Sequence, residues 1–389
     1  MPRQIMTLQD AVQRLLLEFS LPDDQARGRQ LARLAASDAY SDVIAATSRW
    51  TWYDRTFILH CNAPYSTGTI AYDHTGGTYE RQLTLSGGTW PTWSIDGTVV
   101  IDDKYYEVEQ RISDTIITLR ELACPSADVT SGTEYSLDRY RFDLPDDFAS
   151  VVEAWDVNND CNLPITPGAP TSNLSFFIGR SPGQPQFGTV VASGGSVGRL
   201  KFLLSPPPSE AIQINIAYVA RPRQMKIEVE SSGTASGDSA GIAITTSKAV
   251  FTSNMKGSVL RLSSDAATQP TGPAGYPKAY NPAAFESIIV RVVDSTHAHV
   301  SDPLPQAFSG VAYTVSDPVD IAFDSMSAAY AACAKFRMSK LLSQAQAAQD
   351  SLERQSVRQL REALALDARV VGSGESLRRF PRTTVVTAT

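Results

Sequence analysis

The sequence predicts an α+β protein: a helical bundle framework with a long C-terminal helix, carrying two inserted small all-β domains, each a barrel or a sandwich. Three observations predict this class. Helical periodicity occupies both ends of the chain, short segments of alternating apolar and polar residues fill the middle, and two of those β segments resemble each other. A length of 389 residues also favours two or three domains over a single core.

The first 50 residues form the predicted N-terminal helix pair (1–50). Thr7 is a suitable N-cap, and Pro22 opens a second helix that runs to about Arg49. The first helix has one apolar stripe at helical spacing, formed by Leu8, Ala11, Val12, Leu15 and Leu16.

Two segments have the alternating pattern of apolar and polar residues that is typical of small all-β domains. Residues 51–137 form the first predicted insertion and residues 231–321 the second, with a Ser/Gly-rich linker at 231–241. Residues 138–230 between them are assigned to the framework, with a short helix opened by Pro145 and a strand hairpin around Pro206–Pro208.

The two β segments share several features in the same order, which predicts two copies of one small domain. The alternative, that any two Thr/Val-rich β segments look alike, stays open at this point. The matched pairs are Thr89-Trp90 with Val250-Phe251, Gly97 with Gly257, Arg111–Thr115 with Arg291–Ser295, and Ser131-Gly132 plus Tyr135 with Ser309-Gly310 plus Tyr313.

The C-terminal part is predicted to be one long helix (322–370) and an extended tail (371–389). From Asp324 to Arg369 there is no glycine or proline, so an unbroken helix would be roughly 65–70 Å long. Neighbouring helices of about 40 residues cannot bury such a rod. Its alanine-rich surface is therefore expected to await partner chains.

Composition excludes several classes of function. A net charge of −7 argues against general affinity for nucleic acid or anionic membrane, and no apolar run approaches the ~20 residues of a membrane span. The four cysteines have no CxxC spacing, which is typical of buried thiols in a reducing compartment. Asp10 and Glu18 interrupt the apolar start, so we expect no signal peptide.

Few residues suggest chemistry, and we expect no catalytic, cofactor or metal residues. His297 and His299 would face one side of a strand and could bind a metal with Asp294 or Asp302, although an exposed strand face is the simpler interpretation. The "DVNND" segment (156–160) lacks the glycine and glutamate of a calcium loop. The adjacent acids of "LPDDF", Asp146 and Asp147, suit a helix start better than a catalytic pair.

An aromatic group in the first β segment has two interpretations. Trp90 and Trp93, with Tyr105 and Tyr106, could stack on sugars or fill the core of the small domain, and the core is the favoured assignment. The sugar-binding interpretation would make the chain a carbohydrate-binding or carbohydrate-cleaving component.

The arrangement resembles the head-to-tail adaptor (connector) proteins of short-tailed bacteriophages. The resemblance rests on the helix pair ending in "SRWTWY", on "YSLDRYRFDLPDDF", on the strand pair in "LLSPPPSEAIQINIAYVARP", and on a long Ala/Gln/Arg-rich C-terminal helix followed by a tail. It covers nearly the whole chain in layout. The second β insertion, 231–321, departs from the shortest members of the family.

The resemblance implies a structural virion protein that is not an enzyme. Its expected partners are copies of itself in a twelve-subunit ring, the portal protein, and a tail nozzle or tail tube protein, with DNA passing through the channel without sequence-specific binding. The expected location is the head–tail interface of the virion, assembled in the host cytoplasm. The residues expected to dock on the portal are Leu377, Arg378, Arg379, Phe380, Arg382, Val385 and Val386.

Two alternatives remain from the sequence. One is another structural subunit of the tail or baseplate, in which the two β domains face outward. The other is the carbohydrate-binding tail component that would use the Trp90 and Trp93 cluster.

Overall fold

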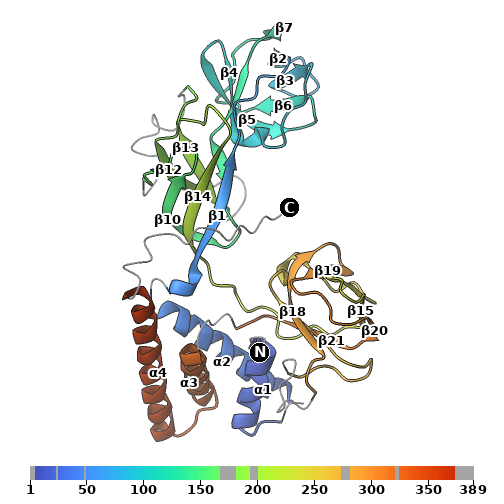
Figure 1. Cartoon of the computed structure of the whole chain (residues 1–389), viewed down its shortest axis with the longest axis vertical. Coiled ribbons are helices and arrows are strands. Elements are labelled where there is room, and N and C mark those ends of the chain that lie inside the picture. Colours follow the sequence, from blue (N-terminus) through green and yellow to red (C-terminus); the bar gives the residue numbers. More distant parts are fainter. Residues whose placement is uncertain are drawn as a thin grey trace. The chain divides into compact units, whose positions relative to one another are not determined.

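The computed structural model describes residues 5–22, 25–47, 50–166, 181–192, 200–272, 281–319 and 324–372. Strands hold 37% of the residues and helices 24%, in four sheets and, among the described residues, four α-helices (Figure 1). The predicted helical bundle framework is therefore wrong, because the molecule is mostly β-sheet. Helical periodicity governs only the two ends of the chain, and strand periodicity continues between them.

The chain divides into two compact units. The first unit contains Met1–Trp52 and Pro222–Thr389, and the second contains Tyr53–Arg221. The chain therefore passes from one unit to the other twice.

The first unit contains a layer of four helices: α1 (Leu8–Glu18), α2 (Ala26–Ala45), α3 (Asp324–Leu341) and α4 (Gln346–Gly372). The predicted N-cap is confirmed, since the Asp10 N–H donates to the Thr7 hydroxyl and the Thr7 N–H donates to the Asp10 carboxylate. The predicted apolar stripe of α1 is also buried.

The long C-terminal helix predicted from the sequence is wrong, because the chain turns back between α3 and α4. Ser343 has a φ of 53°, and its N–H donates to the carbonyl of Lys340. A left-handed residue directly after the last helical turn is a common helix end, and serine fills the position here without a glycine. The turn lays α4 against α3, so α4 covers apolar surface that an extended rod would expose.

The first unit also contains a seven-stranded, barrel-like sheet, the second barrel (Figure 1). Its core includes Ile244, Leu260, Ile289 and Tyr313, all fully buried. In spatial order its strands are β20 (Phe308–Val311), β15 (Ala235–Gly237), β16 (Ala243–Thr246), β19 (His297–Val300), β18 (Phe285–Val292), β17 (Val259–Leu262) and β21 (Tyr313–Ser316).

The predicted flexible linker at 231–241 is wrong in part, because it contains β15. Ala235 pairs with Thr246 on one side and with Val311 on the other. This short strand contributes only the small side chain of Ala235 to the barrel core, and the neighbouring strands provide most of it.

A buried arginine fastens the second barrel to α1. Arg261 of β17 is 1% exposed, and its guanidinium donates to the carboxylates of Asp10 and Glu286 at 2.7 Å each. Leu8 also donates its N–H to the carbonyl of Asp317, directly after β21. An arginine shared by two carboxylates satisfies its charge at a buried position, so this junction is specific.

The second unit contains the other seven-stranded sheet, the first barrel. Trp90, Val99, Leu83 and Ile117 are among its fully buried core residues. In spatial order its strands are β7 (Val129–Thr133), β2 (Thr69–Asp73), β3 (Gln82–Ser86), β6 (Ile116–Leu119), β5 (Lys104–Arg111), β4 (Gly97–Ile101) and β8 (Ser136–Arg139).

The rest of the second unit is a pair of smaller sheets that share one core around Phe142, Phe202 and Ile214. One sheet has the order β1 (Asp54–Cys61), β14 (Ile212–Ala220), β10 (Phe148–Asp156) and β11 (Cys161–Asn162). The other has the order β12 (Phe187–Ala192), β13 (Leu200–Ser205) and β9 (Arg141–Asp143).

Two predictions for this region are corrected. The segment after Pro145 forms strand β10 and no helix, because Phe148, Ala154 and Asp156 alternate into the core between β11 and β14. The residues that flank Pro206–Pro208 are strands, as predicted, but they do not form a hairpin. β13 pairs with β9 and β12, whereas β14 pairs with β1 and β10.

The two barrels have the same strand order when their strands are numbered along the chain. Equivalent hydrogen bonds close equivalent loops: Trp90 N–H donates to the carbonyl of Asp114 at 2.7 Å, and Phe251 N–H donates to that of Ser295 at 2.9 Å. This pairing shifts the predicted match of 111–115 with 291–295 by one residue. Ser113 and Asp294 then occupy the same turn position, where each side chain accepts N–H bonds from the residues two and three further on.

Candidate interaction surface

The histidines considered for a metal site lie on β19. The two carboxylates considered as further ligands make hydrogen bonds of their own. His297 Nδ1 is 2.9 Å from the Asp294 carboxylate, while the Asp302 carboxylate accepts from Ser287 and Ser301. The Thr296 N–H and the His297 side chain hold the pKa of Asp294 well below its usual range. Within the described ranges, no group of three or more His, Cys, Asp or Glu residues is arranged to hold a metal ion.

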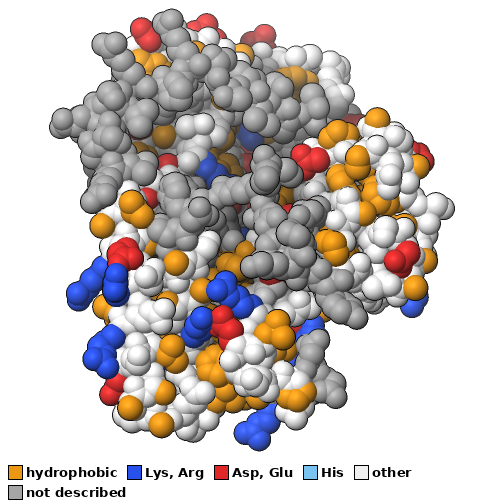
Figure 2. Space-filling view, turned by 60° about the horizontal axis from the view of Figure 1, so that its bottom comes forward, with side chains coloured by type: hydrophobic (Ala, Val, Ile, Leu, Met, Phe, Trp, Pro, Cys, Tyr) orange, Lys and Arg blue, Asp and Glu red, His pale blue; other side chains and the backbone are white. Residues whose placement is uncertain are grey.

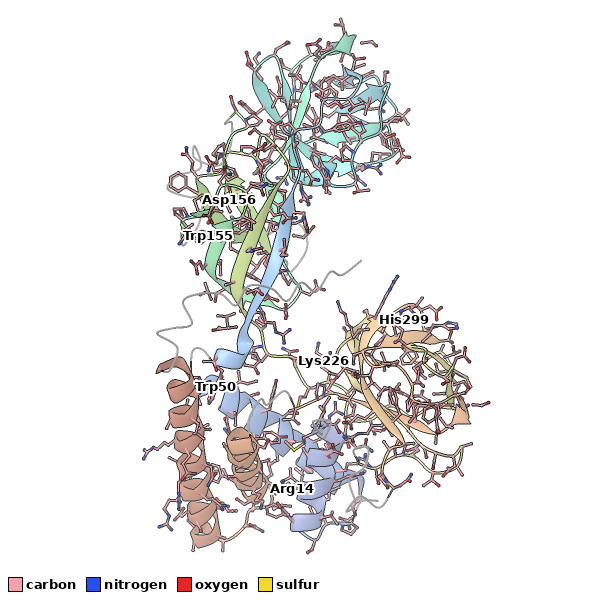
Figure 3. The ribbon with its side chains drawn as sticks, viewed as in Figure 1. Arg14, Trp50, Trp155, Asp156, Lys226 and His299 are labelled. Atoms are coloured by element: carbon pink, nitrogen blue, oxygen red, sulfur yellow. The ribbon has the colours of Figure 1, made fainter. Side chains whose placement is uncertain are left out.

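The acidic pairs noted in the sequence have structural roles. Asp147 accepts from the Tyr218 hydroxyl at 2.9 Å and from Arg55 at 2.8 Å, and the helix start predicted for it does not exist. Asp156 is fully buried and accepts the N–H groups of Asn158 and Asn159 in the turn between β10 and β11 (Figure 3). Its carboxylate is therefore used by the turn.

The tryptophan cluster is divided between core and surface. Trp90 is 1% exposed, packs edge-on against Tyr135, and donates its indole N–H to the carbonyl of Thr115. Trp93 is half-buried, with the Arg139 guanidinium 5.7 Å from its ring centroid. Trp90 therefore serves the core, as the sequence favoured, and presents no face to a sugar.

All four cysteines are free thiols. Burial raises the pKa of Cys61 to about 12 and that of Cys333 to about 11. A thiol reacts as its thiolate, so these two are unreactive near neutral pH.

The residues predicted to dock on the portal, Leu377, Arg378, Arg379, Phe380, Arg382, Val385 and Val386, lie outside the described residues. The helix that leads to them is described to Gly372.

The strongest candidate for a functional surface is the outer face of α4. Towards the layer, α4 buries Ser356, Ala363 and Asp367, which lie on one stripe because they are spaced by seven and four residues. Asp367 also accepts a 2.5 Å hydrogen bond from the Thr51 hydroxyl. These contacts fix which face of the helix points outward.

That outward face has a shallow depression, here called the α4 depression. It is lined by Glu353, Arg354, Val357, Arg358, Arg361 and Glu362. Val357, its one apolar lining residue, is 42% exposed, and the Arg358 guanidinium lies 2.9 Å from the Glu362 carboxylate. In the space-filling view, Lys and Arg side chains stand along the α4 side of the helical layer (Figure 2). An exposed apolar side chain together with several arginines is a combination that protein contacts use.

Sequence reasoning missed the α4 depression, although a signal for it existed. Arg354, Arg358 and Arg361 follow the i, i+4, i+7 spacing of one helix face. The spacing alone does not say whether that face is exposed, because its exposure depends on the turn at Ser343, which sends the opposite stripe of α4 onto α3.

Among the described helices, none combines the length and the hydropathy needed to cross a membrane. Comparisons of the chain with known protein families, with curated proteins and with solved structures give no match.

Proposed function

We propose that this chain is a structural, non-enzymatic subunit of a ring that joins the portal to the tail of a short-tailed bacteriophage and encloses the DNA channel. The observation that carries the proposal is the uncovered outer face of α4. Val357 and Leu366 are 42% and 43% exposed on a 27-residue helix whose packing within the layer is mainly with α3. A ring of identical copies and a portal provide cover for such a surface.

The charge distribution also supports this role. A net charge of −7 disfavours tight binding of passing DNA, which a conduit must release. The segment after α4 combines apolar anchors with arginines, among them Phe380 and Arg382, and this composition suits docking on a larger partner. In this proposal the protein works in the virion at the head–tail interface, is assembled in the host cytoplasm, and contacts a tail nozzle or tail tube on its other side.

The test is co-expression of the full chain with the portal protein of the same virus, followed by electron microscopy. We expect rings of about twelve copies on the portal, where the number comes from the family resemblance. A chain lacking residues 377–389 should keep its fold, by circular dichroism, and lose portal attachment. A 42.1 kDa species that stays monomeric with and without portal contradicts the proposal.

A second candidate, a tail or baseplate structural subunit, is favoured by the repeated barrels, because two modules of one topology suit a protein that contacts several neighbours. The deletion of 377–389 separates the two candidates. Only the adaptor loses portal attachment, whereas a baseplate subunit keeps its assembly behaviour.

A further inference from the structure

A second surface is rich in glutamate, whereas three of the five charged residues that line the α4 depression are arginines. The loop after β6 presents Leu122, which is 100% exposed, beside Glu121. Arg81 lies 3.2 Å from the Glu80 carboxylate and 3.3 Å from that of Glu109, and it donates to the carbonyl of Leu119 at the end of β6. Glu80 and Glu109 therefore pair with one arginine at the end of β6, and Glu121 and the exposed Leu122 follow in the loop that begins there. We call Glu80, Glu109, Glu121 and Leu122 the Leu122 knob.

The second barrel shows that this knob is not a requirement of the barrel topology. Its equivalent loop, after β19, contains Leu304, which is 2% exposed and packs in the barrel core. The same loop can therefore turn its leucine inward. In the first barrel Cys124 packs against the core from this loop, and Leu122 stays outside.

We infer that the Leu122 knob of one copy docks into the α4 depression of a second copy of this chain. Leu122 contacts the exposed Val357, and the glutamates of the knob face Arg354, Arg358 and Arg361. The inference rests on the proposed function, in which copies of the chain assemble into a ring. It further identifies the two surfaces through which neighbouring copies contact each other.

Charge and shape favour this occupant over nucleic acid. The depression offers the exposed Val357 among its charged residues, and a phosphate backbone has no apolar group to cover that side chain. The knob offers both an apolar side chain for Val357 and carboxylates for the arginines.

The two surfaces lie on different elements, so the contact between copies is heterologous. Each copy then offers one knob and one depression. A contact of this type continues from copy to copy, and it forms a ring when the rotation between copies closes and a filament when it does not. A two-fold contact between two α4 helices would instead stop at a dimer.

Disulfide trapping in the full chain tests this directly. We expect the double variant Leu122→Cys, Val357→Cys to form a ladder of dimers, trimers and larger species on mild oxidation. Each single variant and the wild type, which provides the background from the native cysteines, should not form it. A dimer in Val357→Cys alone indicates the two-fold contact, and an internal cross-link within a monomer indicates docking within one chain. Either result overturns the inference.

Charge reversal provides the second test, read out by sedimentation velocity. Glu121→Arg and Arg361→Glu should each weaken self-association about tenfold, and combining them should restore most of it. The control is Val293→Asp on the second barrel, where Val293 is 48% exposed. This substitution should leave self-association unchanged. Binding of a fluorescent DNA duplex that Arg361→Glu abolishes, without an effect on self-association, overturns the inference in favour of nucleic acid.

Failure of this inference is distinguishable from failure of the proposed function. Rings that form on the portal with both single reversals uphold the proposed function and reject this interface. A wild-type chain that never assembles rejects both.

Discussion

The two barrels share a topology, and each has its own apolar core, but they differ in what they present outward. Their irregularities coincide: β5 and β18 each have a bulge opposite the following strand, and Tyr135 and Tyr313 each donate a hydroxyl to a backbone carbonyl, of Thr67 and Ser232. Bulges and buried hydroxyls fix register and curvature, so these positions belong to the scaffold.

The outward positions diverge according to what each barrel must contact. The pairing of Val99 with Leu137 and of Leu260 with Val315 makes Val100 the equivalent of Arg261. Arg261 fastens the second barrel to α1, whereas the first barrel is fastened by Lys201 to Asp96 at 3.0 Å and by Arg141 to Glu107 at 3.0 Å. Barrels of the same topology are therefore attached to the rest of the chain by different ion pairs.

The greatest loss of stability is expected for a substitution in one of the two equivalent cores. Trp90→Ala should destabilise the first barrel by about 3–5 kcal/mol, because it removes a fully buried aromatic side chain and leaves a cavity. Hydrogen exchange should show lost protection in β2–β8 and retained protection in β15–β21. Phe251→Ala should give the reverse pattern at a similar cost. Equal loss in both barrels under either substitution contradicts their independence as cores.

The next effect tests the attachment of the second barrel. Arg261→Ala should cost about 3 kcal/mol in denaturant unfolding, because Asp10 and Glu286 are left without their shared cation. Protection of α1 against hydrogen exchange should fall as well. The matched substitution Val100→Ala in the first barrel should cost about 1 kcal/mol. A similar loss for both variants would show that Arg261 contributes only its packing.

A smaller effect distinguishes the barrels by pH. Asp138 and Ser316 occupy equivalent positions on β8 and β21, opposite Thr98 and Val259. Burial raises the pKa of Asp138, and its Oδ2 has no hydrogen-bond partner. A carboxyl group whose pKa is raised by folding contributes stability that is fully present below pH 3.8, its ordinary pKa. This contribution is lost as pH rises through the folded-state pKa.

Asp138→Asn removes this titration. The free energy of unfolding of the variant should therefore increase relative to that of the wild type as pH rises from about 3 to 7. The difference should reach about 1 kcal/mol. Ser316→Ala, the control in the second barrel, should show a difference that does not change with pH. A variant that loses stability relative to the wild type as pH rises contradicts the assigned burial effect.

The smallest effect concerns two equivalent glycines. Gly132 and Gly310 have φ angles of 92° and 59°, and an added Cβ at either meets no atom within 4 Å. Any cost of an alanine is therefore due to the backbone alone. Gly132→Ala should cost about 1 kcal/mol in thermal unfolding and Gly310→Ala less, since 59° lies in the left-handed region that other residues can adopt. The opposite order contradicts this account.

Local patterns in the sequence predicted local structure well. The sequence predicted the cap at Thr7, the buried stripe of α1, the core role of Trp90 and the similarity of the two β segments, because each depends on residue spacing within a continuous segment. Where spacing was ambiguous, the predictions were wrong: Pro145 suggested a helix, but the pairing of β10 with β14 made a strand.

Side-chain periodicity reports the local backbone directly, so the residues alone were enough to predict helical ends and β-rich middle segments. They favoured two copies of one small β module, and the shared strand order of the barrels supports this prediction. The packing of distant segments was needed to show that α3 and α4 separate at Ser343, that Arg261 joins a barrel to α1, and that Val357 and Leu122 remain exposed. Those outcomes depend on which surfaces distant segments cover, and that is a property of the packed chain, which no short stretch of residues encodes.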